Sequence, residues 1–152
     1  VLDDVPTGNP TIRLPDNVDY MAEAAVTQAD SLVSPESARH ILYGDGFGSG
    51  GHLWPGNPNK TPFPQSWDET RILNTIDEIV SNPNTQWYVQ NGGLNGLTAA
   101  GDAGKFISHT NVPGSNLPVR VIYEPSTGRV VTAFPDPNPI PPTILNRPVP
   151  KG

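Results

Sequence analysis

The chain has 152 residues, no cysteine and a net charge of −6 at pH 7. This length predicts one domain with a substantial core, while the absence of cysteine excludes a disulfide framework. No apolar run approaches the ~20 residues that cross a membrane. Residues 1–36 hold seven acidic residues and one basic residue, whereas residues 37–152 hold eight of each. The second part is therefore neutral, which argues against tight binding of long nucleic-acid duplexes.

The N-terminal part predicts an irregular lead and then a helix. Residues 1–15 contain three prolines and show little periodicity, which is typical of a linker. Asp16 or Asn17 is a suitable N-cap for a helix over residues 18–32, which has a narrow, alanine-rich apolar stripe. We expect a single domain over residues 16–136.

Two further helices have clear end signals. Ser34 is a predicted N-cap, Pro35 fits the first turn, and the helix should end at Tyr43 with Gly44 as its C-cap. A predicted capping box over residues 66–69 begins a second, strongly amphipathic helix over residues 68–80.

The remainder of the chain predicts strands. Alternating or short apolar runs bounded by glycine or asparagine occur at residues 85–90, 94–100, 105–110, 117–124 and 129–134. Residues 137–152 are rich in proline, so we expect an extended tail without regular structure. Helices followed by antiparallel strands give an α+β fold.

The chemistry is concentrated in residues 37–64, which contain six of the fifteen glycines. A short apolar run ends at Gly44, a glycine-dense loop delivers His52, and Lys60 follows eight residues later, while His40 lies just before the loop. Two histidines and a lysine can supply a general base, a general acid and a cation for a developing oxyanion.

Four motifs resemble those of the bacterial EndoU endoribonucleases and occur in the family's order. They are RHIL at 39–42, GGH at 50–52, KTPFPQSW at 60–67, and the pair RVI at 120–122 with VVTAFP at 130–135. The resemblance implies a fold of two small helix-plus-sheet halves that flank a catalytic cleft. It also implies an endoribonuclease toxin domain, of the kind found at the C-terminus of polymorphic toxins of contact-dependent growth inhibition.

The resemblance implies a catalytic triad of His40, His52 and Lys60, which needs neither a metal nor another cofactor. His52 would be the base and His40 the acid, although the sequence alone leaves that order open. Attack by the 2′-hydroxyl would give a 2′,3′-cyclic phosphate and a 5′-hydroxyl. Thr132 and Phe134 fall in the motif that binds the base of the substrate.

Two positions depart from the family pattern. Asn59 stands before the lysine where the family usually has glycine, and Phe134 replaces a tyrosine. Phenylalanine keeps a face for base stacking but lacks the hydroxyl, so a preference for uridine is in doubt, while Thr132 can still donate a hydrogen bond to a base.

The resemblance also implies partners and a destination. We expect an RNA substrate, with tRNA the first choice, and a dedicated immunity protein in the producing cell. We expect a monomer that does not bind membranes, secreted as an effector and delivered into the cytoplasm of target bacteria.

Two other functions are compatible with the residues. His40, His52 and His109 form a possible metal site for a metal-dependent hydrolase. Alternatively, Trp54, Trp67 and Trp87 are possible sugar platforms of a non-enzymatic, adhesive or structural β-domain.

Overall fold

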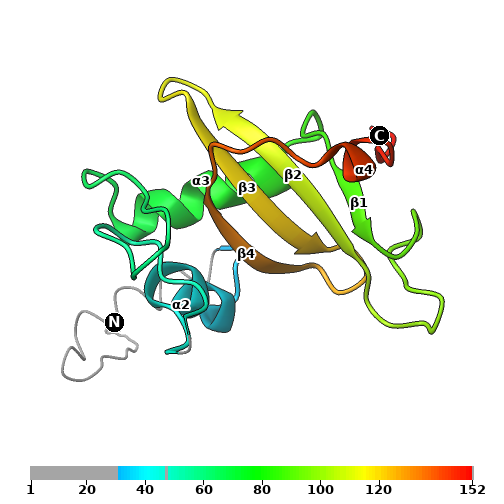
Figure 1. Ribbon diagram of the computed structural model, residues 1–152, viewed down its shortest axis with the longest axis horizontal. Coiled ribbons are helices and arrows are strands. Elements are labelled where there is room, and N and C mark those ends of the chain that lie inside the picture. Colours follow the sequence, from blue (N-terminus) through cyan, green and yellow to red (C-terminus); the bar gives the residue numbers. More distant parts are fainter. Residues whose placement is uncertain (1–30, 47, 152) are drawn as a thin grey trace, which may run out of the picture. The chain divides into compact units, whose positions relative to one another are not determined.

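The computed structural model describes residues 31–46 and 48–151, and residues 32–152 belong to one compact unit. The helices and strands, drawn in Figure 1, are α2 (Pro35–Tyr43), α3 (Glu69–Ser81), β1 (Tyr88–Asn91), β2 (Lys105–Val112), β3 (Leu117–Glu124), β4 (Arg129–Pro135) and α4 (Pro142–Leu145). The predicted lead and nearly all of the predicted helix over residues 18–32 lie outside the described residues.

Helix α2 has the predicted bounds. The Ser34 side chain accepts a hydrogen bond from the Ser37 amide, and Pro35 occupies the first turn. At the other end Gly44 has a φ of 84°, and its amide donates to the carbonyls of Arg39 and His40. The Gly44 cap ends the helix after Tyr43, so His40 and Ile41 lie on its last turn.

Helix α3 begins one position later than predicted, because a different residue caps it. The Asp68 side chain accepts from the Arg71 amide at 2.8 Å, so Asp68, and not Ser66, is the N-cap. A carboxylate at this position is also favoured by the positive end of the helix dipole. The predicted apolar face is buried, with Ile72 and Ile76 fully inaccessible to solvent.

The strands form a four-stranded antiparallel sheet in the order β1-β2-β3-β4. The α+β prediction is confirmed, with one four-stranded sheet in the described residues where the resemblance implied two helix-plus-sheet halves. The predicted strand over residues 94–100 is wrong. Gly92 and Gly96 have positive φ values, and the segment folds back on itself through a Gly93–Leu97 backbone bond, leaving one isolated bridge.

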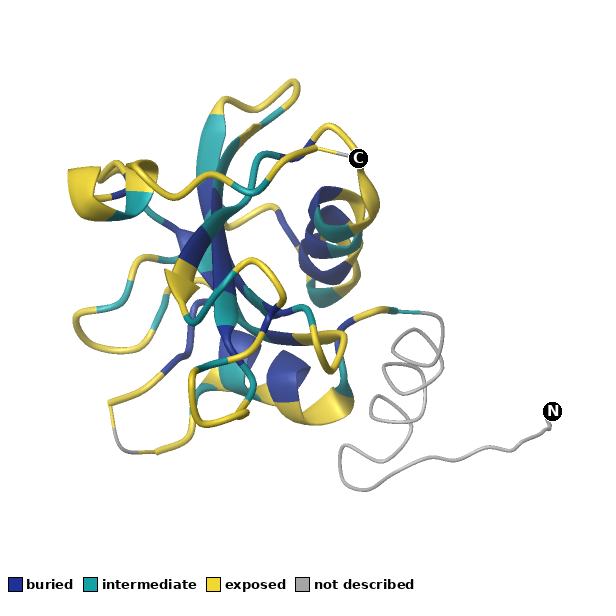
Figure 2. Ribbon diagram, turned by 90° about the vertical axis from the view of Figure 1, so that its right-hand side faces the viewer, coloured by how far each residue is buried: buried dark blue, intermediate teal, exposed yellow. Residues whose placement is uncertain are grey.

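The two faces of the sheet are buried by different parts of the chain. Helices α2 and α3 pack with Val119, Val121, Val130 and Ala133 in the larger apolar core. The other face carries a small cluster around Ile107, Ile122 and Ile140. Figure 2 shows α3 and α4 on opposite sides of the sheet.

The proline-rich C-terminal segment is ordered, so the prediction of a tail without regular structure is wrong. Ile140 is 4% exposed, and the short helix α4 follows it. Beyond α4, the Val89 amide donates to the Arg147 carbonyl and the Val149 amide donates to the Trp87 carbonyl. The segment thus crosses one face of the sheet and pairs with β1, as the orange and red ribbon in Figure 1 shows.

Candidate active site

The glycine loop holds His52 against the end of α2. The amide of Gly51 donates to the His40 carbonyl at 3.0 Å, and the amide of His52 donates to the Ile41 carbonyl at 2.7 Å. On its other side, the His52 carbonyl accepts from the Phe63 amide at 2.8 Å. His40 and His52 therefore lie on adjoining backbone segments although twelve positions separate them.

Glycine is required at two positions of this loop. A Cβ on Gly50 would lie 2.1 Å from the His40 carbonyl oxygen and 3.0 Å from the His40 ring. A Cβ on Gly51 would lie 2.0 Å from Nδ2 of Asn57. Both residues also have positive φ values, so the loop packs this closely because it carries no side chain here.

The hydrogen bonds of His52 assign its tautomer. Its Nδ1 lies 2.8 Å from the Thr61 carbonyl oxygen. Because a carbonyl only accepts, Nδ1 carries the proton and donates, and Nε2 of the neutral ring holds a lone pair. Among buried side-chain nitrogens and oxygens in the described residues, Ser37 Oγ has no hydrogen-bond partner, while Arg120 Nε lies 2.8 Å from Oδ2 of Asp136 in an ion pair. Nε2 of His52 takes part in no hydrogen bond there and is not among the buried atoms without a partner, so solvent reaches it.

The surroundings of His52 favour the neutral ring. The residue is 5% exposed, and burial lowers its pKa below the ordinary value of about 6.5. The hydrogen bond to Thr61 opposes this shift, while the charges of Lys60 and His40 lower the pKa further. Lys60 directly precedes Thr61, whose carbonyl accepts from His52, and a Cβ on Gly50 would lie 3.0 Å from the His40 ring, so both residues adjoin the loop that carries His52.

His40 has a different environment. Its Nδ1 lies 2.9 Å from Oδ2 of Asp45, and its side chain is 21% exposed. Since a carboxylate accepts, Nδ1 donates here as well, which orients the ring and leaves Nε2 free to carry a second proton. His52 is thus buried and paired with a neutral carbonyl, whereas His40 is paired with an anion and is more accessible.

The two residues predicted to bind the base lie on β4, and Phe134 adjoins His52. The rings of Phe134 and His52 stack with centroids 5.0 Å apart and an interplanar angle of 15°. Thr132 precedes Phe134 by two positions on β4, so both side chains lie on the face of the sheet opposite to α2 and α3. Four of the five predicted site residues are linked through His52. Phe134 stacks on its ring, and the charges of Lys60 and His40 lower its pKa.

Two residues that position the site were not predicted. Thr61 accepts from His52 through its carbonyl, and its hydroxyl donates to the Pro135 carbonyl next to Phe134. Thr61 therefore links the loop that carries His52 to β4, the strand that carries Phe134. Asp45 orients His40. Thr61 lies inside the motif at 60–67, and Asp45 directly follows the helix cap Gly44. Neither position in the sequence indicates that Thr61 bonds to His52 and Pro135 or that Asp45 bonds to His40.

The position of Asn59 explains its departure from the family pattern. Asn59 has a φ of 65°, in the left-handed region that favours glycine. Asparagine tolerates this conformation better than other residues with a side chain, so the substitution leaves the turn before Lys60 intact.

Comparison with protein families decides what these residues belong to. The family model described as bacterial EndoU nuclease matches residues 15–137. The chain belongs to the bacterial EndoU nuclease family. It is an endoribonuclease, and the match extends further toward the N-terminus than the motifs, which begin at Arg39. No curated protein and no solved structure is significantly similar to the chain.

The alternative functions gain little from the geometry. Within residues 31–46 and 48–151, no group of three or more histidine or acidic side chains is arranged to hold a metal ion. Trp67 is 4% exposed and belongs to the core, and Trp87 packs against Tyr123, so of the three tryptophans Trp54 alone is largely exposed, at 47%. No described helix is long and apolar enough to cross a membrane.

Proposed function

We propose that this EndoU nuclease cleaves RNA by transesterification at the 2′-hydroxyl, with His52 as the general base. The observation that carries the proposal is the state of the His52 ring. Its Nδ1 proton is held by the Thr61 carbonyl and its pKa is lowered by burial, so at neutral pH the ring is neutral and Nε2 is free to accept a proton.

The other two members of the triad complete the reaction. Nε2 of His52 takes the 2′-hydroxyl proton as that oxygen attacks phosphorus. Nε2 of His40, whose ring is oriented by Asp45, donates a proton to the departing 5′-oxygen. The Lys60 ammonium offsets the charge that builds up on the non-bridging oxygens. The bond to the 5′-oxygen breaks as the bond to the 2′-oxygen forms, which leaves a 2′,3′-cyclic phosphate and a 5′-hydroxyl.

Phe134 and Thr132 bind the base beside the cut in this proposal. The Phe134 ring already stacks on His52, and its other face is suited to a nucleobase. Thr132 lies on the same face of the sheet and offers a hydroxyl to a base edge. Because the phenol of the family's tyrosine is missing, we expect a broad choice of base with at most a weak preference for uridine.

The biological setting that we propose is that of a toxin. We propose that the nuclease is the active domain of a secreted effector delivered into the cytoplasm of competing bacteria, where it cuts tRNA as a monomer. The producing cell would then need an immunity protein. An inhibitor that covers His40, His52 and Lys60 should present carboxylates, so its association should slow with rising salt, and Lys60→Ala should weaken it.

The proposal is tested by incubating bacterial RNA with the purified protein in EDTA and mapping the ends. We expect cleavage in EDTA, with cyclic phosphate ends that resist phosphatase until acid opens them. Cleavage that needs added metal would support the metal-dependent hydrolase, and no cleavage under any condition would support the adhesive domain. The toxin setting would be contradicted if the protein, made alone in a bacterial cytosol, neither arrested growth nor cut RNA.

A further inference from the structure

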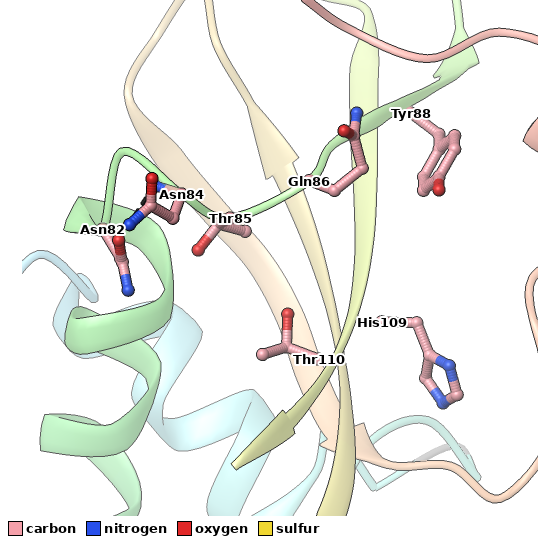
Figure 3. Close-up of a pocket in the computed structure, with 7 residues that line it drawn as sticks. All are labelled: Asn82, Asn84, Thr85, Gln86, Tyr88, His109 and Thr110. Atoms are coloured by element: carbon pink, nitrogen blue, oxygen red, sulfur yellow. Dashed lines mark hydrogen bonds between the residues drawn. The ribbon is translucent and has the colours of Figure 1, made fainter. Parts of the chain in front are cut away.

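A small polar pocket lies at the β1 edge of the sheet. The β4 edge, where Phe134 stacks on His52, is the opposite edge. The pocket has a volume of about 240 Å³, and seven residues of the described chain line it. In Figure 3 the rings of Tyr88 and His109 lie on one side of β2, and the amides of Asn82 and Asn84 lie on the other, with Gln86 between them. These residues lie outside the four motifs named above, although within the span of the family match.

The pocket exists because β1 is shorter than β2. The pairing of these strands begins at Tyr88 opposite Ile107, and in the described chain no strand continues it beside Ser108 to Val112. The chain that leads from α3 to β1 instead turns away through Asn82 and Asn84. This part of the β2 edge is thus left without a partner from β1 and lies beside the side-chain amides of Asn82, Asn84 and Gln86.

Several polar groups of the pocket have no partner within the described residues. The side-chain amide of Asn84, the hydroxyl of Tyr88 and Nδ1 of His109 take part in no hydrogen bond there, although the backbone N–H of Asn84 donates to Oδ1 of Asn82. His109 is held by its other nitrogen, because Nε2 lies 2.6 Å from the Asp136 carbonyl and donates to it. Gln86 uses its amide nitrogen to donate to Val149 and Trp87, which leaves its carbonyl oxygen.

The lining indicates a nucleoside rather than a phosphate. Of the seven residues that the structure places around the pocket, none is a lysine, an arginine or an acid. Neutral amides and hydroxyls match the edges of unpaired bases and the ribose hydroxyls, and tyrosine and histidine rings stack on bases. The volume is below the ~300–1,000 Å³ of most small-molecule sites, which suits a single nucleoside.

A direct structural connection joins the pocket to the base platform. His109 is the cross-strand partner of Arg120, and Arg120 is the partner of Phe134, so the three residues form one row across β2, β3 and β4. In addition, His109 donates to the carbonyl of Asp136, two positions after Phe134. Two inter-strand spacings amount to ~10 Å, which corresponds to about three stacked nucleotides at 3.4 Å each.

We propose that this pocket binds one unpaired nucleoside of the RNA substrate, outside the dinucleotide that contains the cut. Tyr88 and His109 supply the stacking surface, and Asn84 and Gln86 bond the base or its ribose. The inference rests on the proposed function, because it takes RNA as the ligand. It predicts that the enzyme prefers single-stranded substrates long enough to cover both sites.

The test compares two substrates, a dinucleotide and an unpaired RNA of about ten nucleotides. Asn84→Ala and Tyr88→Leu should each raise KM for the longer RNA roughly tenfold, with kcat unchanged, and should leave dinucleotide cleavage unchanged. Asn74→Ala, an exposed amide on α3, is the matched control and should change neither. Asn84 is exposed and its side chain bonds to no described residue, so Asn84→Ala decides the question if Tyr88→Leu fails to fold.

The failures of the two proposals are distinguishable. If wild-type protein cleaves both substrates and Asn84→Ala has the same KM as wild type for the longer RNA, the nucleoside site is wrong while the proposed function stands. An equal loss on both substrates would also overturn the site, because it would indicate a disturbed catalytic centre. If wild-type protein cleaves neither substrate, the proposed function fails, and this inference fails with it.

Discussion

The two edges of the sheet are finished in different ways. At the β4 edge, the Thr61 hydroxyl donates to the Pro135 carbonyl, and Phe134 stacks on His52, so the loop of the proposed triad is tied to the strand. At the other edge, β2 extends past the start of β1 and borders a polar pocket. The tied edge suits bond breaking, which needs fixed geometry, whereas the open edge suits binding of a variable nucleoside.

The largest expected effect comes from removing a side chain of the proposed triad at the β4 edge. His40→Ala, His52→Ala and Lys60→Ala should each lower kcat/KM by ~100-fold or more, because each removes a proton transfer or charge stabilisation in the transition state. The loss should be equal for the dinucleotide and the longer RNA. Circular dichroism should show an unchanged fold, and a folded His52→Ala variant with near-normal activity would contradict the mechanism.

The next effect concerns the stacking at the same edge. Phe134→Ala should lower kcat/KM by roughly tenfold, since base stacking on an aromatic ring is worth ~1–3 kcal/mol. It should also raise the pKa of His52, because the ring loses part of the burial that lowers it. Phe134→Tyr keeps the ring and should retain activity. Full activity of a folded Phe134→Ala variant would show that the ring is no base platform.

The smallest effect concerns the orientation of His40. Asp45→Asn should reduce kcat by roughly fivefold or less, because an ion pair with a half-exposed carboxylate is worth ~1 kcal/mol or less. KM should not change, since Asp45 is not expected to touch the substrate. Asp102→Asn, an exposed acid in the loop before β2, is the matched control. A loss as large as that of His40→Ala would mean that Asp45 takes part in catalysis directly.

The same comparison explains what the sequence predicts and what it does not. Local signals were sufficient for α2, whose cap residues Ser34 and Gly44 act within a few positions. The motifs singled out His40, His52 and Lys60 as a candidate triad, because the expected chemistry restricts the residue types, and their catalytic roles stay predictions. The hydrogen bond from the Thr61 hydroxyl to the Pro135 carbonyl joins residues 74 positions apart, and no local sequence pattern indicates such a contact.

The open edge was the harder part to predict. The pocket depends on where β1 begins, and strand ends are set by tertiary pairing rather than by local propensity. The ordered C-terminal segment was missed for a similar reason. Its prolines exclude regular strands, but Ile140 is buried by packing on the far face of the sheet, which composition does not report.

The central claim is that His52 is a neutral base whose Nδ1 carries the proton, and an NMR titration of its ring nitrogens tests it most directly. The lowered pKa predicts a midpoint below about 6.5, with the Nδ1–H tautomer above it. The contribution of this burial to stability is then complete above pH 6.5 and is lost as the pH falls through the lowered pKa. A midpoint above 6.5, or a proton on Nε2 at neutral pH, would contradict the account.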